Sequence, residues 1–415
     1  MSYVGKKPTS VPLTSSDITD GIITSAKIAD GSIATADIAD AAVTKVKTSG
    51  VSSNPFRNII INGDMSIAQR STSVSSISSG TAYDTVDRFS RNIGSAGTWT
   101  ISQSTTVPSG QGFAKSLKMD CTTANGSLSS GSEFVLRQNV EGQNLQYLKK
   151  GTSSAESTTL SFWVRSNKTG TYICELVDND NSRQISQSYT ISSADTWEKK
   201  TLTFAGDTSG AFGNDNGNSL TVGWWLVAGS DFTSGTLSTT WTSSTNANRV
   251  VGQVNLADST SNEWYITGVQ LEAGTSASDF EFLPIDVNLE RCQRYYEKNF
   301  DFATAPADGL NYGLTNSTLS GSAYGTGFMR SNVTFKVKKR TTPSSTFYYV
   351  TGLHSSGTTS GRWSYWDSSS WSQTNGTTSA GETSDTGMDI NIVQSGLTFG
   401  YSYLVGGGWS VDAEL

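Results

Sequence analysis

The sequence is poor in the residues on which many enzymes and metal proteins depend. It has one histidine and three cysteines in 415 residues. A single histidine excludes a metal site with two histidine ligands. Cys121, Cys174 and Cys292 are too widely spaced for a zinc motif or a disulfide framework. We therefore expect three buried free thiols in a chain that is synthesised in a reducing cytoplasm. We also expect no cofactor and no metal.

Charged residues and long apolar runs are also scarce. Only 16% of the residues are charged, and the net charge is −7. A nucleic-acid partner is not expected because phosphate binding needs a basic stripe. Membrane insertion is not expected because no run approaches about 18 apolar residues. Ser, Thr, Gly and Asn are abundant instead, and they favour strands joined by turns over helices. The composition predicts an all-β protein with two or three domains.

The first 47 residues contain a five-residue repeat. An aliphatic residue recurs at every fifth position, with a small residue two positions before it. A strand has a period of two and a helix a period near 3.6, so a period of five indicates a solenoid-like coil rather than a flexible leader. Six repeats are too few to close a core alone, so we expect them to trimerise the chain and dock it. The aliphatic positions are Ile18, Ile23, Ile28, Ile33, Ile38 and Val43.

The rest of the chain divides into four parts. A polar linker at 48–55 precedes a long region, 56–286, in which short apolar alternations are separated by turn residues. This pattern predicts an antiparallel β-sandwich, with its clearest strands at 159–164, 172–177, 198–204, 220–227 and 264–271. Leu160, Phe162 and Val164 should face the core of this sandwich.

A helical connector and a C-terminal β domain are expected next. Residues 287–300 have apolar positions at helical spacing, with Asn288 as the expected N-cap. Residues 301–415 return to strand patterns, most clearly at 332–338, 347–350, 389–393 and 397–404.

Four blocks in the central region resemble carbohydrate-binding jelly rolls of the galactose-binding-like kind. They are Asn58-Ile-Ile-Ile-Asn-Gly-Asp-Met, Leu160-Ser-Phe-Trp-Val-Arg, Thr196-Trp-Glu-Lys-Lys-Thr-Leu-Thr-Phe and Trp264-Tyr-Ile-Thr-Gly-Val-Gln-Leu-Glu. The segment from Gln270 to Tyr296 looks like one that is common in bacteriophage tail-fibre and other virion proteins. A pentad leader also occurs at the front of such proteins. Thr267 and Gly268 stand near the position where calcium-binding relatives carry an acidic residue, so the resemblance does not extend to that ion.

This resemblance implies a bacteriophage tail fibre on the virion surface, synthesised in the host cytoplasm. Such a protein would be a homotrimer, would contact other virion proteins through its N-terminus, and would bind a host surface glycan such as lipopolysaccharide or capsule. Two alternatives stay open. One is a head fibre or capsid decoration protein without glycan binding, and the other is a surface-glycan depolymerase.

Aromatic residues are concentrated in residues 363–415, which contain no Lys or Arg. Flat rings beside polar side chains suit the apolar faces and the hydroxyls of sugars, although the same rings could fill a core. Trp363 and Tyr365 should share one face of a strand, with Trp366 on the other. Trp366 and Trp371 are the better candidates for a glycan platform because Asp367 and three serines separate them like a loop tip.

Catalysis is not expected. His354 lies in a turn-like stretch, and the remaining enzyme hypothesis, glycan hydrolysis, needs two carboxylates about 5 to 9.5 Å apart. The candidates are Asp367, Glu382, Asp385 and Asp389, which resemble solvated turn residues.

Two further polar segments have simple interpretations. Asp178-x-Asp180-x-Ser182 begins like a calcium loop, but Arg183 occupies the position that needs glycine, so we expect a turn. The lysines and arginine at 336, 338, 339 and 340 are expected to protect an exposed strand edge, with binding of a phosphorylated lipopolysaccharide core as the alternative.

Overall fold

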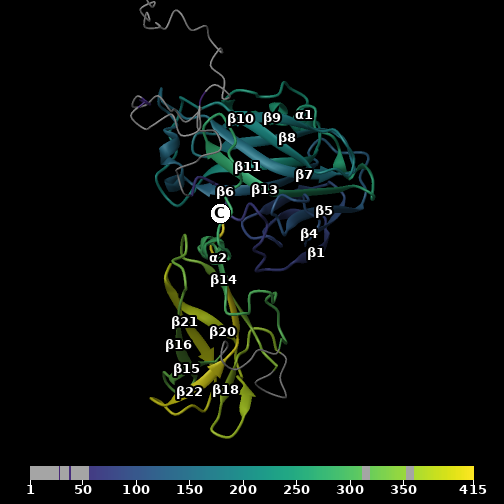
Figure 1. The fold of residues 1–415 in the computed structure, drawn as a ribbon. Helices are drawn as coiled ribbons and strands as arrows, with labels where there is room; N and C mark the ends of the chain where they lie inside the picture. The colour runs from purple at the N-terminus through teal and green to yellow at the C-terminus, as the bar shows by residue number, and fades with distance from the viewer. Residues whose placement is uncertain (1–27, 29–36, 39–55, 311–317, 352–358) are drawn as a thin grey trace, which may run out of the picture. The chain divides into compact units, whose positions relative to one another are not determined.

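The structure is a computed structural model that describes residues 28, 37–38, 56–310, 318–351 and 359–415. The chain divides into two compact units, 1–53 and 54–415. The predicted pentad repeat lies outside the described residues except for Ile28 and Ile38, which are both exposed. His354 also lies outside them. The sheets described below all belong to the second unit (Figure 1).

The central region is an antiparallel jelly-roll sandwich of two sheets (Figure 1). The first sheet has, in spatial order, β1 (Ser73–Ile77), β4 (Thr98–Ser104), β5 (Ser116–Thr123), β13 (Glu263–Ala273), β7 (Thr158–Ser166) and β10 (Glu198–Phe204). The second has β12 (Thr242–Ser243), β9 (Arg183–Ile191), β8 (Gly170–Asp178), β11 (Asn218–Ala228), β6 (Glu133–Glu141), β3 (Ser90–Gly94) and β2 (Gly80–Ala82). The connections include α1 (Ser230–Thr233), η4 (Gly142–Asn144), η5 (Gln146–Leu148), η6 (Asn246–Asn248) and η7 (Leu256–Asp258).

The core of the sandwich lies between these sheets, as the sequence predicts. Leu160, Phe162 and Val164 are fully buried in one apolar cluster with residues of the opposite sheet such as Trp224 and Tyr189. The five predicted strands are confirmed, and most extend one or two residues beyond their predicted ends. The three cysteines are free and buried, as expected. No helix in the described part of the chain is long and apolar enough to span a membrane.

A helix is found in the predicted connector, but it is shorter than the predicted 287–300, since Tyr296–Lys298 form strand β14, and its N-cap is not Asn288. Helix α2 runs from Ile285 to Gln293, and Pro284 is its N-cap. Pro284 has ψ 143°, outside the helical range, and no side-chain hydrogen bond caps the first turn. Asn288 instead lies inside the helix, where its Nδ2 donates to Asp64 Oδ1 at 3.1 Å and to Ser66 Oγ at 3.0 Å. The helix is thereby attached to the jelly roll.

The C-terminal domain contains two more antiparallel sheets (Figure 1). The smaller one has β14 (Tyr296–Lys298), β23 (Gly408–Asp412) and β17 (Ser344–Tyr348). The larger one has β19 (Trp371–Gln373), β18 (Ser364–Trp366), β22 (Ser402–Gly406), β15 (Thr318–Ala323), β16 (Phe328–Thr334), β21 (Gly387–Val393) and β20 (Thr378–Thr383). The strand predicted at 332–338 is displaced, since β16 ends at Thr334, and the strand predicted from 397 begins only at Ser402.

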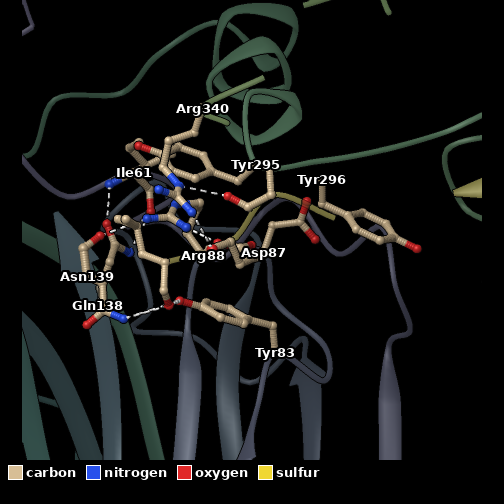
Figure 2. A network of polar contacts seen from close by, with 12 residues as sticks. Ile61, Tyr83, Asp87, Arg88, Gln138, Asn139, Tyr295, Tyr296 and Arg340 are labelled. Atoms are coloured by element: carbon tan, nitrogen blue, oxygen red, sulfur yellow. Dashed lines mark hydrogen bonds and ion pairs between the residues drawn. The ribbon is translucent and has the colours of Figure 1, made fainter. Parts of the chain in front are cut away.

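The two domains are joined by a buried arginine. The Arg88 guanidinium forms an ion pair with Glu414, donates to the Asn139 carbonyl oxygen at 2.7 Å, and lies 3.4 Å from the centroid of the Tyr295 ring (Figure 2). The Arg88 side chain is 1% exposed and that of Glu414 is 6% exposed. The charge of Arg88 is therefore balanced by a residue 326 positions away.

A second arginine holds the same C-terminal segment from the other side. Arg340 donates to the carbonyl oxygens of Ala413 and Glu414, both at 2.9 Å, and to that of Asn216 at 3.0 Å (Figure 2). Tyr83 donates its hydroxyl to the Leu415 carbonyl oxygen at 2.9 Å. Residues 412–415 are thus fixed between the jelly roll and the C-terminal domain.

Candidate functional site

Two tryptophans form a pair on a β-hairpin of the C-terminal domain. Strands β18 and β19 place Trp366 directly opposite Trp371. The ring centroids are 6.0 Å apart and the planes cross at 66°. Trp366 is 36% exposed, and Trp371 is half-buried. The prediction that these two residues flank a loop tip is confirmed.

Asp367 shapes the tip of this hairpin. Its Oδ1 accepts hydrogen bonds from the backbone N–H groups of Ser370 at 2.8 Å and Ser369 at 2.9 Å, and from the Ser369 hydroxyl at 2.8 Å. The backbone bond from Ser370 contributes most to lowering the pKa of Asp367 to about 2. Ser368 adopts the left-handed conformation at φ 82°. Asp367 is therefore a turn-forming carboxylate that stays ionised near neutral pH.

Trp363 and Tyr365 do not belong to this surface, contrary to their candidacy as glycan contacts. Trp363 is fully buried, lies 5.9 Å from the Phe347 ring, and donates from Nε1 to the Gly408 carbonyl oxygen at 3.2 Å. Tyr365 is half-buried and packs 6.3 Å from Tyr403. Trp363 precedes β18 and contacts the smaller sheet through Phe347 and Gly408, whereas the Tyr365 hydroxyl accepts a hydrogen bond from Gln394 Nε2 at 3.2 Å.

The tryptophan pair continues into a row of side chains across the open face of the larger sheet. Tyr365 pairs with Val405, so Trp366 lies beside Leu404, which is 49% exposed. Leu404 pairs with Ser320 on β15. In the register set by Ser322 and Arg330, Ser320 lies beside Asn332, which pairs with Asp389. The row is Trp371, Trp366, Leu404, Ser320, Asn332 and Asp389, and it spans about 24 Å at the usual strand spacing.

A second, polar row runs beside the first. Ser402 pairs with Ser322, Ser322 with Arg330, and Arg330 with Asn391. Arg330 Nε donates to Asn391 Oδ1 at 3.2 Å, and its guanidinium lies 5.1 Å from the Tyr324 ring centroid. In the first row, Asn332 Nδ2 donates to Asp389 Oδ1. These contacts fix the orientation of both amide groups on the exposed face.

Sequence analysis missed the polar part of this face, although a signal was present. Arg330, Asn332 and Thr334 alternate with the buried Met329, Ser331 and Val333 along β16. That alternation indicates a sheet with one solvated side. The predicted start at residue 332 cut the strand in half and hid the pattern.

The four basic residues predicted as one strand edge do not lie together. Only Lys336 and Lys338 are exposed, and Lys338 pairs with Asp385 at 3.1 Å. Lys339 is fully buried, with its Nζ 2.6 Å from Glu297 Oε2. Arg340 holds the C-terminal segment described above. The interpretation as a basic edge was wrong because β16 ends before these residues begin.

The candidate carboxylates for hydrolysis divide into one adjacent pair and two separate residues. Asp367 follows β18 and Asp389 lies on β21, four strands away in the sheet, which corresponds to about 19 Å. That separation exceeds the range for a glycosidase pair. Glu382, in contrast, is exposed on β20 beside Asp389, because Thr383 pairs with Met388 on β21. Asp385 is engaged with Lys338. No group of three or more His, Cys, Asp or Glu residues in the described ranges is placed to hold a metal ion.

The jelly roll carries a separate cleft of ≈ 250 Å³ on the outer face of its second sheet. Glu175 in this cleft binds Arg249 through two hydrogen bonds of 2.7 and 2.8 Å. Arg137 lies nearby, only 4.0 Å from Glu133, and burial lowers its pKa. Thr221 donates to Asn139 Oδ1 at 2.8 Å. The lining is Val135, Arg137, Glu175, Val177, Asn179, Gln184, Thr221, Gly223, Ser244, Asn246 and Arg249, with no aromatic ring.

Comparison with known proteins gives similarity to solved structures only. No protein-family model matches the chain, and no curated protein sequence matches it. Among solved structures, the chain is similar to the enzymatically active domain of tailspike protein 4 from bacteriophage CBA120, with 13% identity over 53% of this chain and a TM-score of 0.29. The match spans 22% of that tailspike chain.

Two sugar-binding structures are similar to about half of the chain. A putative sugar binding protein from Bacteroides thetaiotaomicron has 13% identity over 52% of this chain and 99% of its own, with a TM-score of 0.29. The carbohydrate-binding module TmCBM61, solved with β-1,4-galactotriose, has 13% identity over 52% of this chain and 99% of its own, with a TM-score of 0.26.

Proposed function

We propose that this chain is a bacteriophage tail fibre, or a related virion protein, that attaches the particle to a glycan on the host surface. The observation that carries the proposal is the open face of the C-terminal sheet, where Trp366 and Trp371 adjoin rows of Ser, Asn and Arg side chains. A sugar ring has apolar C–H faces and a rim of hydroxyls. The indoles can stack on the faces while the amides and hydroxyls bond the rim.

The virion assignment is supported by the sequence. The segment from Gln270 to Tyr296 resembles bacteriophage fibre proteins, and the six pentads favour a homotrimer that docks through its N-terminus. The C-terminal domain would then be the part that reaches the cell. Enzymatic turnover is not part of the proposal, although Glu382 and Asp389 are neighbours on β20 and β21. Asp367 serves the turn, and Asp389 already accepts a hydrogen bond from Asn332.

The jelly-roll cleft is a second candidate surface. Arg137, Asn179 and Thr221 can offer hydrogen bonds there, but the cleft has no ring for stacking. We therefore rank it below the C-terminal face for adhesion to a neutral sugar.

The test is adsorption of the labelled full-length protein to candidate host cells and to their purified lipopolysaccharide and capsule. Trp366→Ala and Trp371→Ala should each weaken binding by roughly tenfold, whereas Tyr147→Ala, which removes an exposed ring from the jelly roll, should not. Added salt should change binding little because stacking is not screened.

Each other outcome selects a different hypothesis. If the tryptophan variants bind normally and Thr221→Ala with Arg137→Gln does not, the cleft is the adhesive site. Absence of binding to every cell and polysaccharide would favour a capsid decoration protein. Shortening of the polysaccharide chains would favour a depolymerase.

A further inference from the structure

A lysine at one end of the jelly roll is held as a bound cation would be. Lys150 Nζ lies 2.5 Å from Asp178 Oδ2 and 3.1 Å from Asp207 Oδ2. It also donates to the carbonyl oxygens of Ser209 at 2.9 Å and Gly210 at 2.7 Å. The side chains of Lys150, Asp178 and Asp207 are 4%, 0% and 3% exposed. Four oxygens from two further segments of the chain thus surround one ammonium group.

Aromatic rings complete the enclosure. The ammonium lies 5.1 Å from the centroid of the Phe212 ring and 5.4 Å from that of Trp241. The faces of such rings attract cations. Trp241 is itself fixed, since its Nε1 donates to the Ala205 carbonyl oxygen at 2.7 Å. The carboxylates, the carbonyl oxygens and the ring faces around Lys150 therefore all favour a positive charge at this position.

The charges in this enclosure balance. Asp178 Oδ1 accepts backbone hydrogen bonds from Asp180 at 3.0 Å and Asn181 at 3.1 Å. Asp207 accepts two hydrogen bonds from Arg183, at 2.6 and 3.0 Å. Burial opposes ionisation of Asp207, but bonds from Arg183, Ser209 and Lys150 hold its pKa below the usual value. Two carboxylates face two cations, so removal of Lys150 would leave one negative charge.

We propose that this enclosure is a site for one monovalent cation, which the chain fills with Lys150, and that it binds a primary ammonium ion when that side chain is removed. The nitrogen to oxygen distances of 2.5 to 3.1 Å are mostly longer than the 2.3 to 2.6 Å of Ca²⁺ and all longer than the 2.0 to 2.1 Å of Mg²⁺. A single positive charge also restores neutrality.

The proposal gives a role to a sequence feature that was otherwise unexplained. Asp178-x-Asp180 begins like a calcium loop, and in the structure the Asp178 carboxylate does hold a cation, the lysine ammonium. Two residues of this segment line the jelly-roll cleft. They are Asn179, which follows Asp178, and Gln184, which follows Arg183. The segment that holds this ammonium therefore also contributes residues to the wall of that cleft.

The experiment is chemical rescue of Lys150→Ala in the full-length chain, followed by thermal unfolding. This variant should melt about 10 °C below the wild type, because it leaves buried carboxylates uncompensated. Propylammonium chloride replaces the three lost carbons and the nitrogen, so it should raise the melting temperature of Lys150→Ala in a concentration-dependent way and leave the wild type unchanged. Tetramethylammonium chloride, which has the charge but no N–H donors, should not.

Two controls separate the cation site from general effects. Lys149→Ala removes the neighbouring ammonium, which forms an exposed pair with Glu156 at 3.1 Å, and should melt near the wild type without any response to propylammonium. Lys150→Met keeps a side chain in the enclosure but loses the charge, so it should be destabilised and not rescued. If Lys150→Ala does not fold in plain buffer, the yield of refolded protein with and without propylammonium replaces the melting temperature.

The proposal is overturned if propylammonium has no more effect on Lys150→Ala than tetramethylammonium has. It is also overturned if CaCl₂ rescues the variant better than propylammonium at equal concentration, since the site would then prefer a divalent ion.

Discussion

Replacing Arg88 with methionine should weaken the whole second unit of the chain. The Arg88 side chain is 1% exposed and its partner Glu414 is 6% exposed, so the variant leaves a carboxylate buried without its main counter-charge. Loss of one partner of a buried pair costs about 3 to 5 kcal/mol. Arg70 stays 3.3 Å from Glu414 and compensates in part, so we expect the lower end, about 3 kcal/mol.

In a unit of this size, such a loss corresponds to a fall in melting temperature of about 6 °C. Differential scanning calorimetry on the full-length protein measures it. The double variant Arg88→Met with Glu414→Gln removes both charges and should recover a large part of the loss, which a double-mutant cycle would quantify. Arg165→Met is the matched control, because its pair with Asp195 is partly exposed, at 20% and 58%, and should contribute less than about 1 kcal/mol.

The reasoning is refuted if Arg88→Met melts no lower than Arg165→Met. It also fails if Glu414→Gln adds to the damage of Arg88→Met instead of relieving it, because the two charges would then not depend on each other.

Three further predictions concern the assembly, the domains and the tip of the hairpin. Light scattering should find a trimer for the full-length chain and a monomer for a fragment that starts at Asn54; a monomeric full-length chain would contradict the role given to the pentads. A fragment of residues 56–284 should unfold cooperatively but at a lower temperature than one of residues 56–300, because Glu141 loses the bonds from Arg294 and Tyr295; equal melting temperatures would contradict this. The folded pKa of Asp367, about 2, lies below the ordinary value of 3.8 for an aspartate, so its contribution to stability should be present above about pH 4 and fade as the pH falls to about 2. The difference in melting temperature between the wild type and Asp367→Asn should shrink over that window, and a constant difference would count against the turn bonds.

The sequence predicts local features well and long-range partnerships poorly. Both ends of the strand at 198–204 are predicted correctly because its alternation is regular. The turn between Trp366 and Trp371 is predicted correctly because Asp and Ser favour turns. In contrast, Lys339 looks like a surface residue until Glu297, 42 positions away, is seen beside it. The row from Trp366 to Asp389 depends on which strands are neighbours, and no local pattern contains that information.

The distance along the chain between Arg88 and Glu414 also bears on how the protein is made. Glu414 is synthesised 326 residues after Arg88, which takes roughly 15 to 65 s at ordinary rates of elongation. The last strand of the jelly roll ends at Ala273, 141 residues before Glu414, so for roughly 7 to 28 s of this time a completed jelly roll carries Arg88 without that partner. The Arg88–Glu414 ion pair can therefore form only after both domains have been synthesised, so this contact between the domains is made late.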